Sequence, residues 1–153
     1  MTSASFHVTA HSAAPPERVY AILADGPNWP RWAGPLIGRG EWEREGSPTK
    51  EGVGAIRKIG RAPLFAREEI VVHDPPRHHA YTILSGQPVR NYRADVRLTD
   101  NERGGTLITW TAEFDPTIPG TGALLELWFR RIIGATARRL ARAAEAEESE
   151  TKN

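Results

Sequence analysis

The chain has 153 residues, a length typical of one domain with a buried core. Its 20 lysine and arginine residues and 19 aspartate and glutamate residues leave a net charge of +1, which gives no argument for binding nucleic acid or an anionic membrane. The absence of cysteine excludes disulfides and thiolate metal sites. No apolar run approaches a membrane span and no signal peptide is recognised, so we expect a cytoplasmic protein without membrane insertion.

The first part of the chain is predicted to form one strand and two short helices. Residues 5–12 alternate between apolar and polar side chains, as a half-buried strand does. The prolines at 15–16 suit the first turn of a helix, where a missing N–H costs no hydrogen bond. That helix is expected to end at 25–27, and a further helical turn at 28–32 to stop at the Gly-Pro pair 34–35.

Six further strands are predicted, with glycine, proline and asparagine turns between them. Their expected ranges are 39–45, 52–60, 65–73, 77–85, 92–99 and 104–114. Consecutive strands with short connections pair with each other, which predicts an antiparallel meander. A sheet of this kind twists strongly and curls around its concave face.

A long helix is predicted over residues 120–144, directly after the last strand. Both elements have one apolar side, made of Ile108, Trp110, Ala112 and Phe114 in the strand and of Leu125, Trp128, Phe129, Ile132 and Leu140 in the helix. Both sides are buried if the helix lies across the sheet, and we expect a cavity between them. The polar residues 147–153 are expected to form a disordered tail.

The loop at 61–64 sets the pairing of the strands before and after it. With this loop, Arg57 faces Glu68 and Ile59 faces Ala66. The paired side chains share a face with apolar residues, so the charged pair is expected on the inner face. The same alternation places five further residues inside, namely Ile70, His79, Tyr81, Tyr92 and Ala94.

Several stretches resemble one known superfamily. They are APPERVYAILADGPNWPRW, GVGAIRKI, REEIVVHDPP, NYRADVRLT and GGTLITW, which together with the closing helix span residues 6–144. They resemble the polyketide cyclase/dehydrase-like branch of the START-related superfamily, also called SRPBCC or Bet v 1-like. The resemblance implies an α+β helix-grip fold, in which a curved antiparallel sheet of about seven strands wraps on a long C-terminal helix and two short helices follow the first strand. We therefore expect a single domain over residues 1–146.

The resemblance also implies a hydrophobic or aromatic ligand, such as a polyketide or a lipid, in an internal cavity. Some members are cyclases or aromatases, some only bind ligands and some chaperone proteins, so the fold does not establish an activity. Binding of such a molecule is the favoured function. The alternative is a polyketide cyclase, aromatase or dehydrase that uses Arg57, Glu68 and cavity tyrosines. A chaperone or quinone-binding partner would need a large exposed apolar patch, of which the outer face of the sheet gives no sign.

Arg57 and Glu68 form the sharpest signal, because a charged pair on an apolar face is costly to desolvate. One interpretation is a structural salt bridge that closes the hairpin. The other is a polar handle, in which Arg57 donates hydrogen bonds to a ligand oxygen or enolate and Glu68 orients it. Glu68 also matches an acidic position that is frequent in the superfamily.

Tyr81, Tyr92 and His79 are weaker candidates. Their hydroxyl and imidazole groups can orient a polar ligand or transfer protons, although buried tyrosines ordinarily pack in a core. The catalytic candidates are Arg57, Glu68 and Tyr81. No ligand set for a metal and no cofactor motif is recognised, so we expect neither.

Four aromatic residues complete the expected site. Trp32 is placed at the mouth of the cavity, and Trp110, Trp128 and Phe129 on its wall. The full set of expected ligand-binding residues is Trp32, Arg57, Glu68, Ile70, His79, Tyr81, Tyr92, Ala94, Trp110, Trp128, Phe129 and Ile132. The expected partner is a hydrophobic small molecule and not nucleic acid, and the chain is expected to be a monomer or a homodimer.

Overall fold

The computed structural model describes the backbone of residues 3–152 and the side chains of residues 3–146. The elements are β1 (Ala4–Ser12), α1 (Pro16–Ala24), the 3-10 helix η1 (Gly26–Arg31), β2 (Arg39–Arg44), β3 (Ile56–Arg61), β4 (Leu64–Asp74), β5 (His78–Ser85), β6 (Val89–Asp100), β7 (Thr106–Pro116) and α2 (Gly122–Lys152). This is the predicted order of one strand, two short helices, six strands and one long helix.

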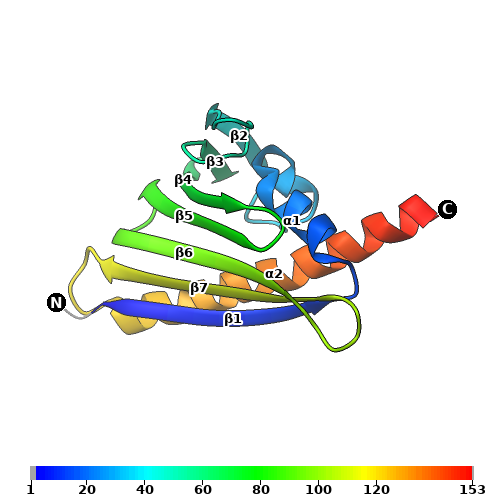
Figure 1. The fold of residues 1–153 in the computed structure, drawn as a ribbon. Helices are drawn as coiled ribbons and strands as arrows, with labels where there is room; N and C mark the ends of the chain where they lie inside the picture. The colour runs from blue at the N-terminus through cyan, green and yellow to red at the C-terminus, as the bar shows by residue number, and fades with distance from the viewer. Residues whose placement is uncertain (1–2, 153) are drawn as a thin grey trace.

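The seven strands form one antiparallel sheet with the order β1-β7-β6-β5-β4-β3-β2. All neighbouring strands except β1 and β7 follow each other in the chain, so the predicted meander is confirmed. Figure 1 shows the curved sheet, with α2 lying along β1 and β7 and α1 near one end. The α+β helix-grip architecture is therefore confirmed.

The predicted register of β3 and β4 is also confirmed. Arg57 pairs with Glu68, and Ile59 pairs with Ala66. Gly60, next to the turn, takes a φ of 146°, and a Cβ at this position would collide with the carbonyl oxygen of Leu64. A glycine is therefore required at the point where the hairpin closes.

Several element boundaries differ from the prediction, including those of β7, which spans Thr106–Pro116 and not 104–114. The strand expected over 52–60 begins only at Ile56, because 52–55 form a turn in which Gly54 takes a φ of 91°. Strand β6 begins earlier than expected, at Val89, and α2 runs past residue 144 to Lys152. The side chains of 147–152 and all of Asn153 lie outside the described residues, so the disordered tail stays a prediction.

Helix α2 is held to the edge strand β1 by polar contacts as well as by packing. The backbone N–H groups of Ser5 and Ala13 donate to the carboxylates of Glu126 and Glu145, each at 2.9 Å. One contact lies near each end of β1, so together they set the direction of the helix along the strand. Helix η1 contacts β2 and β3 and covers the other half of the sheet.

Aromatic rings fill the space between the sheet and the N-terminal half of α2. The ring centroid of Phe129 lies 5.2 Å from that of Phe114, 5.5 Å from that of Tyr92 and 5.9 Å from that of Phe6. Trp110 is completely buried beside them. The prediction of a cavity between the sheet and the helix is therefore wrong for the region where these rings meet. Both layers contribute large side chains that interlock there.

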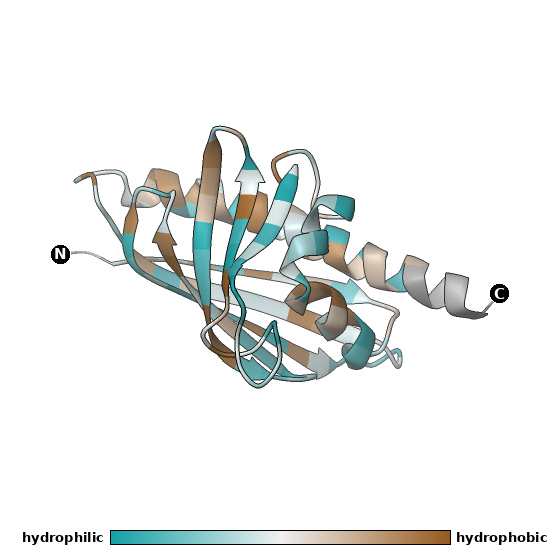
Figure 2. Ribbon diagram, turned by 90° about the horizontal axis from the view of Figure 1, so that it is seen from above, coloured by the Kyte–Doolittle hydropathy of each residue, from teal (hydrophilic) through white to brown (hydrophobic). Residues whose placement is uncertain are grey.

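Two residues expected to face the sheet do not. Trp128 is 48% exposed, and Ile132 is half-buried and outside the buried core, whereas Phe129 and Ile133 pack inward. Successive residues of a helix differ by about 100° in direction, so the side chains next to Phe129 and Ile133 turn away from the sheet. Figure 2 shows the resulting hydrophobic bands in the N-terminal half of α2 and along the strands.

Candidate functional site

The centre of the site is the ion pair between β3 and β4. Nε of Arg57 donates to Oε1 of Glu68 at 2.7 Å, and the two side chains are 0% and 8% exposed. The other two guanidinium nitrogens, Nη1 and Nη2, are buried without a hydrogen-bond partner among the described residues. A buried cation with two unused donors is costly unless something else binds them.

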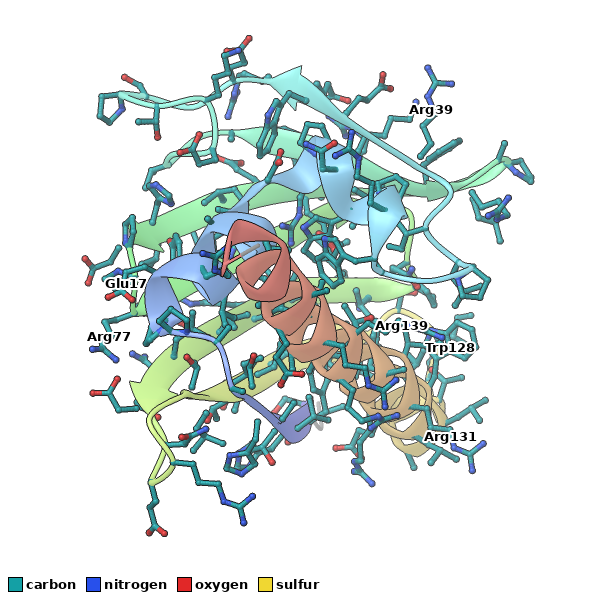
Figure 3. All side chains as sticks on the ribbon, turned by 90° about the vertical axis from the view of Figure 1, so that its right-hand side faces the viewer. Glu17, Arg39, Arg77, Trp128, Arg131 and Arg139 are labelled. Carbon is teal, nitrogen blue, oxygen red and sulfur yellow. The ribbon has the colours of Figure 1, made fainter. Side chains whose placement is uncertain are left out.

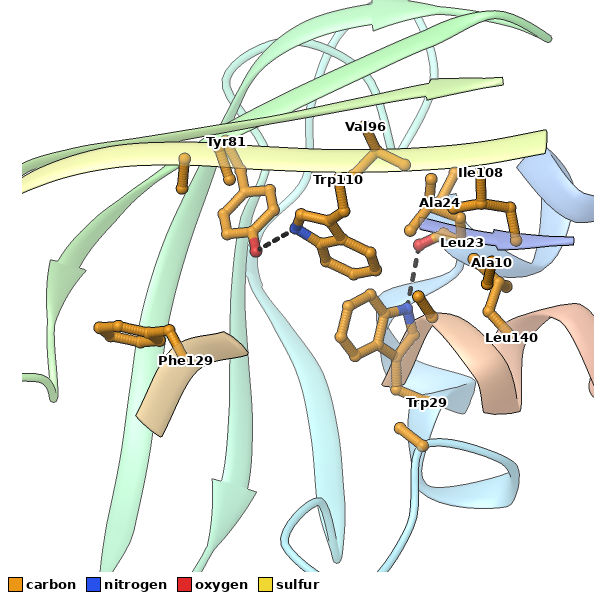
Figure 4. Close-up of a cluster of buried hydrophobic side chains, with 14 of the residues drawn as sticks. Ala10, Leu23, Ala24, Trp29, Tyr81, Val96, Ile108, Trp110, Phe129 and Leu140 are labelled. Atoms are coloured by element: carbon orange, nitrogen blue, oxygen red, sulfur yellow. Dashed lines mark hydrogen bonds between the residues drawn. The ribbon is translucent and has the colours of Figure 1, made fainter. Parts of the chain in front are cut away.

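Aromatic rings enclose this guanidinium. Its Cζ atom lies 4.3 Å from the ring centroid of Trp29 and 4.6 Å from that of Tyr81. Such contacts compensate part of the desolvation of the cation. Trp29 is held in place by a 2.9 Å hydrogen bond from its Nε1 to the carbonyl oxygen of Leu23 (Figure 4).

Close packing of η1 completes the enclosure. A Cβ at Gly26 would lie 3.2 Å from Cδ of Arg57 and 3.5 Å from the indole of Trp42. The missing side chain at Gly26 therefore lets the first turn of η1 lie directly over the arginine. Neither Gly26 nor Trp42 was predicted from the sequence, since a Gly-Pro pair and a lone strand tryptophan are common outside sites.

Two tyrosines lie beside the arginine. Nε1 of Trp110 donates to the hydroxyl of Tyr81 at 3.2 Å, and the ring centroids of Tyr81 and Tyr92 are 6.0 Å apart (Figure 4). Burial raises the pKa of both phenols, and the nearby charge of Glu68 raises that of Tyr81 further. Both phenols therefore keep their protons at neutral pH, and each hydroxyl interacts with the other.

His79 adds a neutral imidazole to the same interior. It is completely buried, and neither ring nitrogen has a hydrogen-bond partner among the described residues. Burial, followed by the positive charge of Arg57, holds the pKa of His79 well below its usual range. The rings of Tyr20 and Tyr81 flank it at centroid distances of 5.9 and 6.3 Å.

A cavity of about 520 Å³ lies on the outer side of this polar cluster, against α1. Its wall combines apolar side chains with charged ones, and the lining residues are Glu17, Tyr20, Ala21, Ala24, Asp25, Trp42, Lys50, Glu51, His73, Pro75 and Pro76. The hydroxyl of Tyr20 lies 3.0 Å from Nδ1 of His73 and donates to the carbonyl oxygen of His78 at 3.2 Å.

Two rings separate the cavity from the polar cluster. Trp42 lines the cavity and is the cross-strand neighbour of Arg57, and Tyr20 lines it and packs against His79. The sequence predicted none of Tyr20, Trp42 and His73 as site residues. The one signal for Tyr20 was its place in the first helix beside the buried Val19, which indicates packing and not a site.

Most of the predicted site residues lie together in the interior. Those that are buried around the ion pair or in the adjoining core are Arg57, Glu68, Ile70, His79, Tyr81, Tyr92, Ala94, Trp110 and Phe129. Trp32 is half-buried with its ring centroid 5.0 Å from that of Trp29, whereas Trp128 and Ile132 point away from this interior. A role of any of them in ligand binding stays a prediction.

The described residues contain neither a cluster of metal-ligating side chains nor a membrane-spanning helix. Within the described part of the chain, no group of three or more histidine, aspartate or glutamate side chains is placed to hold a metal ion. No helix in that part is both long and apolar enough to cross a bilayer.

A curved antiparallel sheet that grips a long C-terminal helix defines a helix-grip protein. The model of the family "Polyketide cyclase / dehydrase and lipid transport" matches residues 3–145. The chain belongs to this family, as its resemblance to the START-related superfamily predicted. Polyketides and lipids are both hydrophobic, so membership supports a hydrophobic ligand in general terms.

Relatives and structural neighbours agree with this assignment. The uncharacterized proteins Rv2574 of Mycobacterium tuberculosis and Mb2604 of Mycobacterium bovis are each 30% identical over 140 residues, which is 90% of this chain and 80% of theirs. The structure of XoxI from Bacillus cereus matches with a TM-score of 0.75 at 19% identity, covering 95% of this chain and 98% of that one. An uncharacterized Bacillus thuringiensis protein matches with a TM-score of 0.74 at 17% identity, covering 92% and 98%. These two neighbours support the fold alone.

Proposed function

We propose that the protein binds a hydrophobic or aromatic small molecule that carries an oxygen acceptor. The observation that carries the proposal is the guanidinium of Arg57, which is completely buried and has two nitrogens without a partner in the described residues. A carbonyl, enolate or carboxylate oxygen matches these donors. The two unpaired nitrogens of the neutral His79 provide further polar contacts nearby.

The cavity beside α1 is the proposed entrance. Its volume of about 520 Å³ is within the range of small-molecule sites, and its wall is mainly apolar with a few polar groups. Trp42 and Tyr20 stand between this cavity and the polar cluster. A ligand that displaces the indole of Trp42 would lie with its apolar body in the cavity and its oxygen toward Arg57.

Native mass spectrometry of the purified protein tests for a co-purifying ligand. A thermal-shift panel of aromatic polyketides, flavonoids and fatty acids follows, because a bound ligand raises the midpoint of unfolding. We expect stabilisation by members with a carbonyl or carboxylate group. A panel without any stabilising compound, together with a mass spectrum without a ligand, would contradict the proposal.

The arginine is then tested with a charge-neutral double variant, Arg57→Met with Glu68→Leu, which leaves no unpaired buried charge. A hydrogen bond from a charged donor contributes about 1.5–3 kcal/mol, so we expect about a 10- to 150-fold loss of affinity for a carbonyl-bearing ligand. The affinity for a matched hydrocarbon ligand should fall much less. Isothermal titration calorimetry measures both, and equal losses would remove Arg57 from the ligand site.

A cyclase, aromatase or dehydrase activity is the second candidate. The observation that favours it is the meeting of a cationic donor, a neutral imidazole and a protonated phenol, in Arg57, His79 and Tyr81. Such groups can stabilise an enolate and transfer protons during ring closure and loss of water. A stabilising polyketide recovered as a cyclised or dehydrated product, and unaltered with Tyr81→Phe, would support catalysis. Chromatographic retention is measured together with mass, because ring closure by itself leaves the mass unchanged. Recovery of unchanged compound supports binding alone.

A further inference from the structure

Large apolar side chains are uncovered along one side of α2. Leu124 is 67% exposed and Trp128 48% exposed, and Leu127 on the same side is exposed as well. Ile118, in the loop that precedes the helix, adds a fourth exposed apolar side chain. Scattered apolar residues are ordinary on a protein surface, but a group of this size on one helix face marks a contact surface.

Arginines continue the same side of the helix. About 3.6 residues complete a turn, so positions 124, 131 and 138, at steps of seven, return to nearly the same direction. Arg131, Arg138 and Arg142 are all exposed. Figure 3, which looks along α2, shows Trp128 and Arg131 on the same side of the helix. We call Leu124, Leu127, Trp128, Arg131, Arg138 and Arg142 the outer stripe.

No described carboxylate of α2 offsets the outer stripe. Residues 122–146 contain five arginines and two glutamates. The carboxylates of these two, Glu126 and Glu145, accept hydrogen bonds from backbone N–H groups of β1 and so face the sheet. The outer stripe is therefore apolar at one end and positively charged along the rest, although the whole chain is nearly neutral.

We propose that the outer stripe docks on the surface of an anionic phospholipid bilayer. Tryptophan and leucine on one side of a helix insert shallowly at the level of the headgroups, and arginines beside them bind lipid phosphates. A second copy of the chain fits the charge less well, because its outer stripe offers no described carboxylate of α2 to pair with the arginines. The proposal rests on this surface alone and does not require the interior ligand.

The cavity remains accessible in this orientation. Glu17, which lines the cavity, lies on the opposite side of α2 from Trp128 (Figure 3). A protein adsorbed through the outer stripe therefore keeps its proposed entrance directed away from the lipid. Docking and ligand binding can be measured separately for this reason.

Co-sedimentation of the full-length protein with vesicles tests the proposal. We expect pelleting with mixed phosphatidylcholine and phosphatidylglycerol vesicles, weakening as salt is added, and little pelleting with phosphatidylcholine alone. Trp128 also provides a fluorescence signal, because it is the most exposed of the five tryptophans: Trp29 and Trp110 are buried, and Trp32 and Trp42 are half-buried and lie outside the outer stripe. Its emission should shift to shorter wavelength on binding, and the shift should be lost in Leu124→Gln with Trp128→Gln.

A matched pair of triple variants isolates the arginines. Each arginine near an anionic surface contributes about fivefold in affinity, so changing Arg131, Arg138 and Arg142 to glutamine should cost on the order of 100-fold. The control changes Arg39, Arg90 and Arg103, which are exposed elsewhere, and removes the same net charge. The control variant should lose much less affinity for the vesicles, because exposed charges farther than a Debye length from the membrane are screened.

Three results would overturn the proposal. The first is an absence of binding to anionic vesicles. The second is an equal loss in both triple variants, which would indicate a net-charge effect. The third is a dimer in size-exclusion chromatography that Trp128→Gln dissociates, without lipid binding, which would assign the outer stripe to a second copy. The Arg57→Met, Glu68→Leu variant should bind vesicles normally, so failure of the ligand proposal is distinguishable from failure of this one.

Discussion

The buried guanidinium of Arg57 has, within the described residues, one nitrogen that is paired and two that are not, and this arrangement affects stability and ligand binding in opposite ways. Its Nε is paired with Glu68, and rings of Trp29 and Tyr81 cover its faces, so part of the desolvation is compensated. Its two Nη atoms are left without partners in the described residues. A purely structural salt bridge would gain from satisfying them, and a ligand site would gain from keeping them available.

The ion pair can be tested through stability alone. Arg57→Met should lower the free energy of unfolding by about 3–5 kcal/mol, because it leaves the buried Glu68 without its partner. The double variant with Glu68→Leu should recover most of that loss. Urea denaturation measures both values. The matched control is Arg67→Met. Arg67 directly precedes Glu68 in β4 and forms an exposed ion pair with Glu43, so its loss should change the free energy of unfolding little. A double variant as unstable as the single one would contradict this account.

His79 predicts a pH dependence with a definite sign. Its pKa is lowered in the folded state, so below the unfolded value of about 6.5 the unfolded chain binds a proton that the folded chain does not. Stability should therefore fall as the pH decreases below that value, by about 1.4 kcal/mol per pH unit. His79→Phe should flatten this part of the stability profile, measured by urea denaturation at several pH values.

Two comparisons make the assignment to His79 specific. His11→Gln changes an exposed histidine of β1 and should keep the slope. Burial would raise the pKa of Asp95, but hydrogen bonds from Arg93 and His78 lower it below 3.8, so stability from this group is lost only in stronger acid. A slope that survives in His79→Phe would show that other groups dominate between pH 5 and 7, roughly the range in which histidines titrate.

At the scale of elements, helix α2 carries two different apolar surfaces. One contains Phe129 and Leu140 and is buried against the sheet, and the other contains Leu124 and Trp128 and is exposed. Periodicity alone gives both surfaces the same residue types. Packing against β1 and β7 selects which of them faces inward.

Two tryptophan substitutions separate the buried surface from the exposed one. Trp110→Ala removes a completely buried indole and its hydrogen bond to Tyr81, so we expect a loss of about 3–5 kcal/mol in the free energy of unfolding. Trp128→Ala should change it by no more than about 0.5 kcal/mol, as surface substitutions usually do. Thermal or urea unfolding gives both values, and a large loss at Trp128 would place that side chain in the core.

Across the whole molecule, the aromatic core, the polar cluster, the cavity and the outer stripe lie in different places. The aromatic core joins sheet and α2, the polar cluster lies between β3, β5 and η1, and the cavity opens beside α1. The outer stripe lies on the side of α2 that faces away from the cavity (Figure 3). This separation allows a ligand site and a docking surface to work without blocking each other.

Periodicity and loop lengths were sufficient to predict the architecture and the most specific contact. Strand alternation and the short loop at 61–64 were enough to pair Arg57 with Glu68 and to place His79, Tyr81 and Tyr92 inside, because a strand has only two faces. The motifs shared with the superfamily led to the helix-grip fold, which the structure confirms.

The position of the cavity could not be predicted from the sequence. Whether a gap between sheet and helix is filled depends on the sum of side-chain volumes from elements far apart in the chain, and here Phe6, Tyr92, Phe114 and Phe129 fill it. The cavity forms instead where α1, β2 and β4 converge, with residues that show no common spacing. The rotation of α2 was equally undetermined, because Trp128 and Phe129 are adjacent, similarly apolar and about 100° apart.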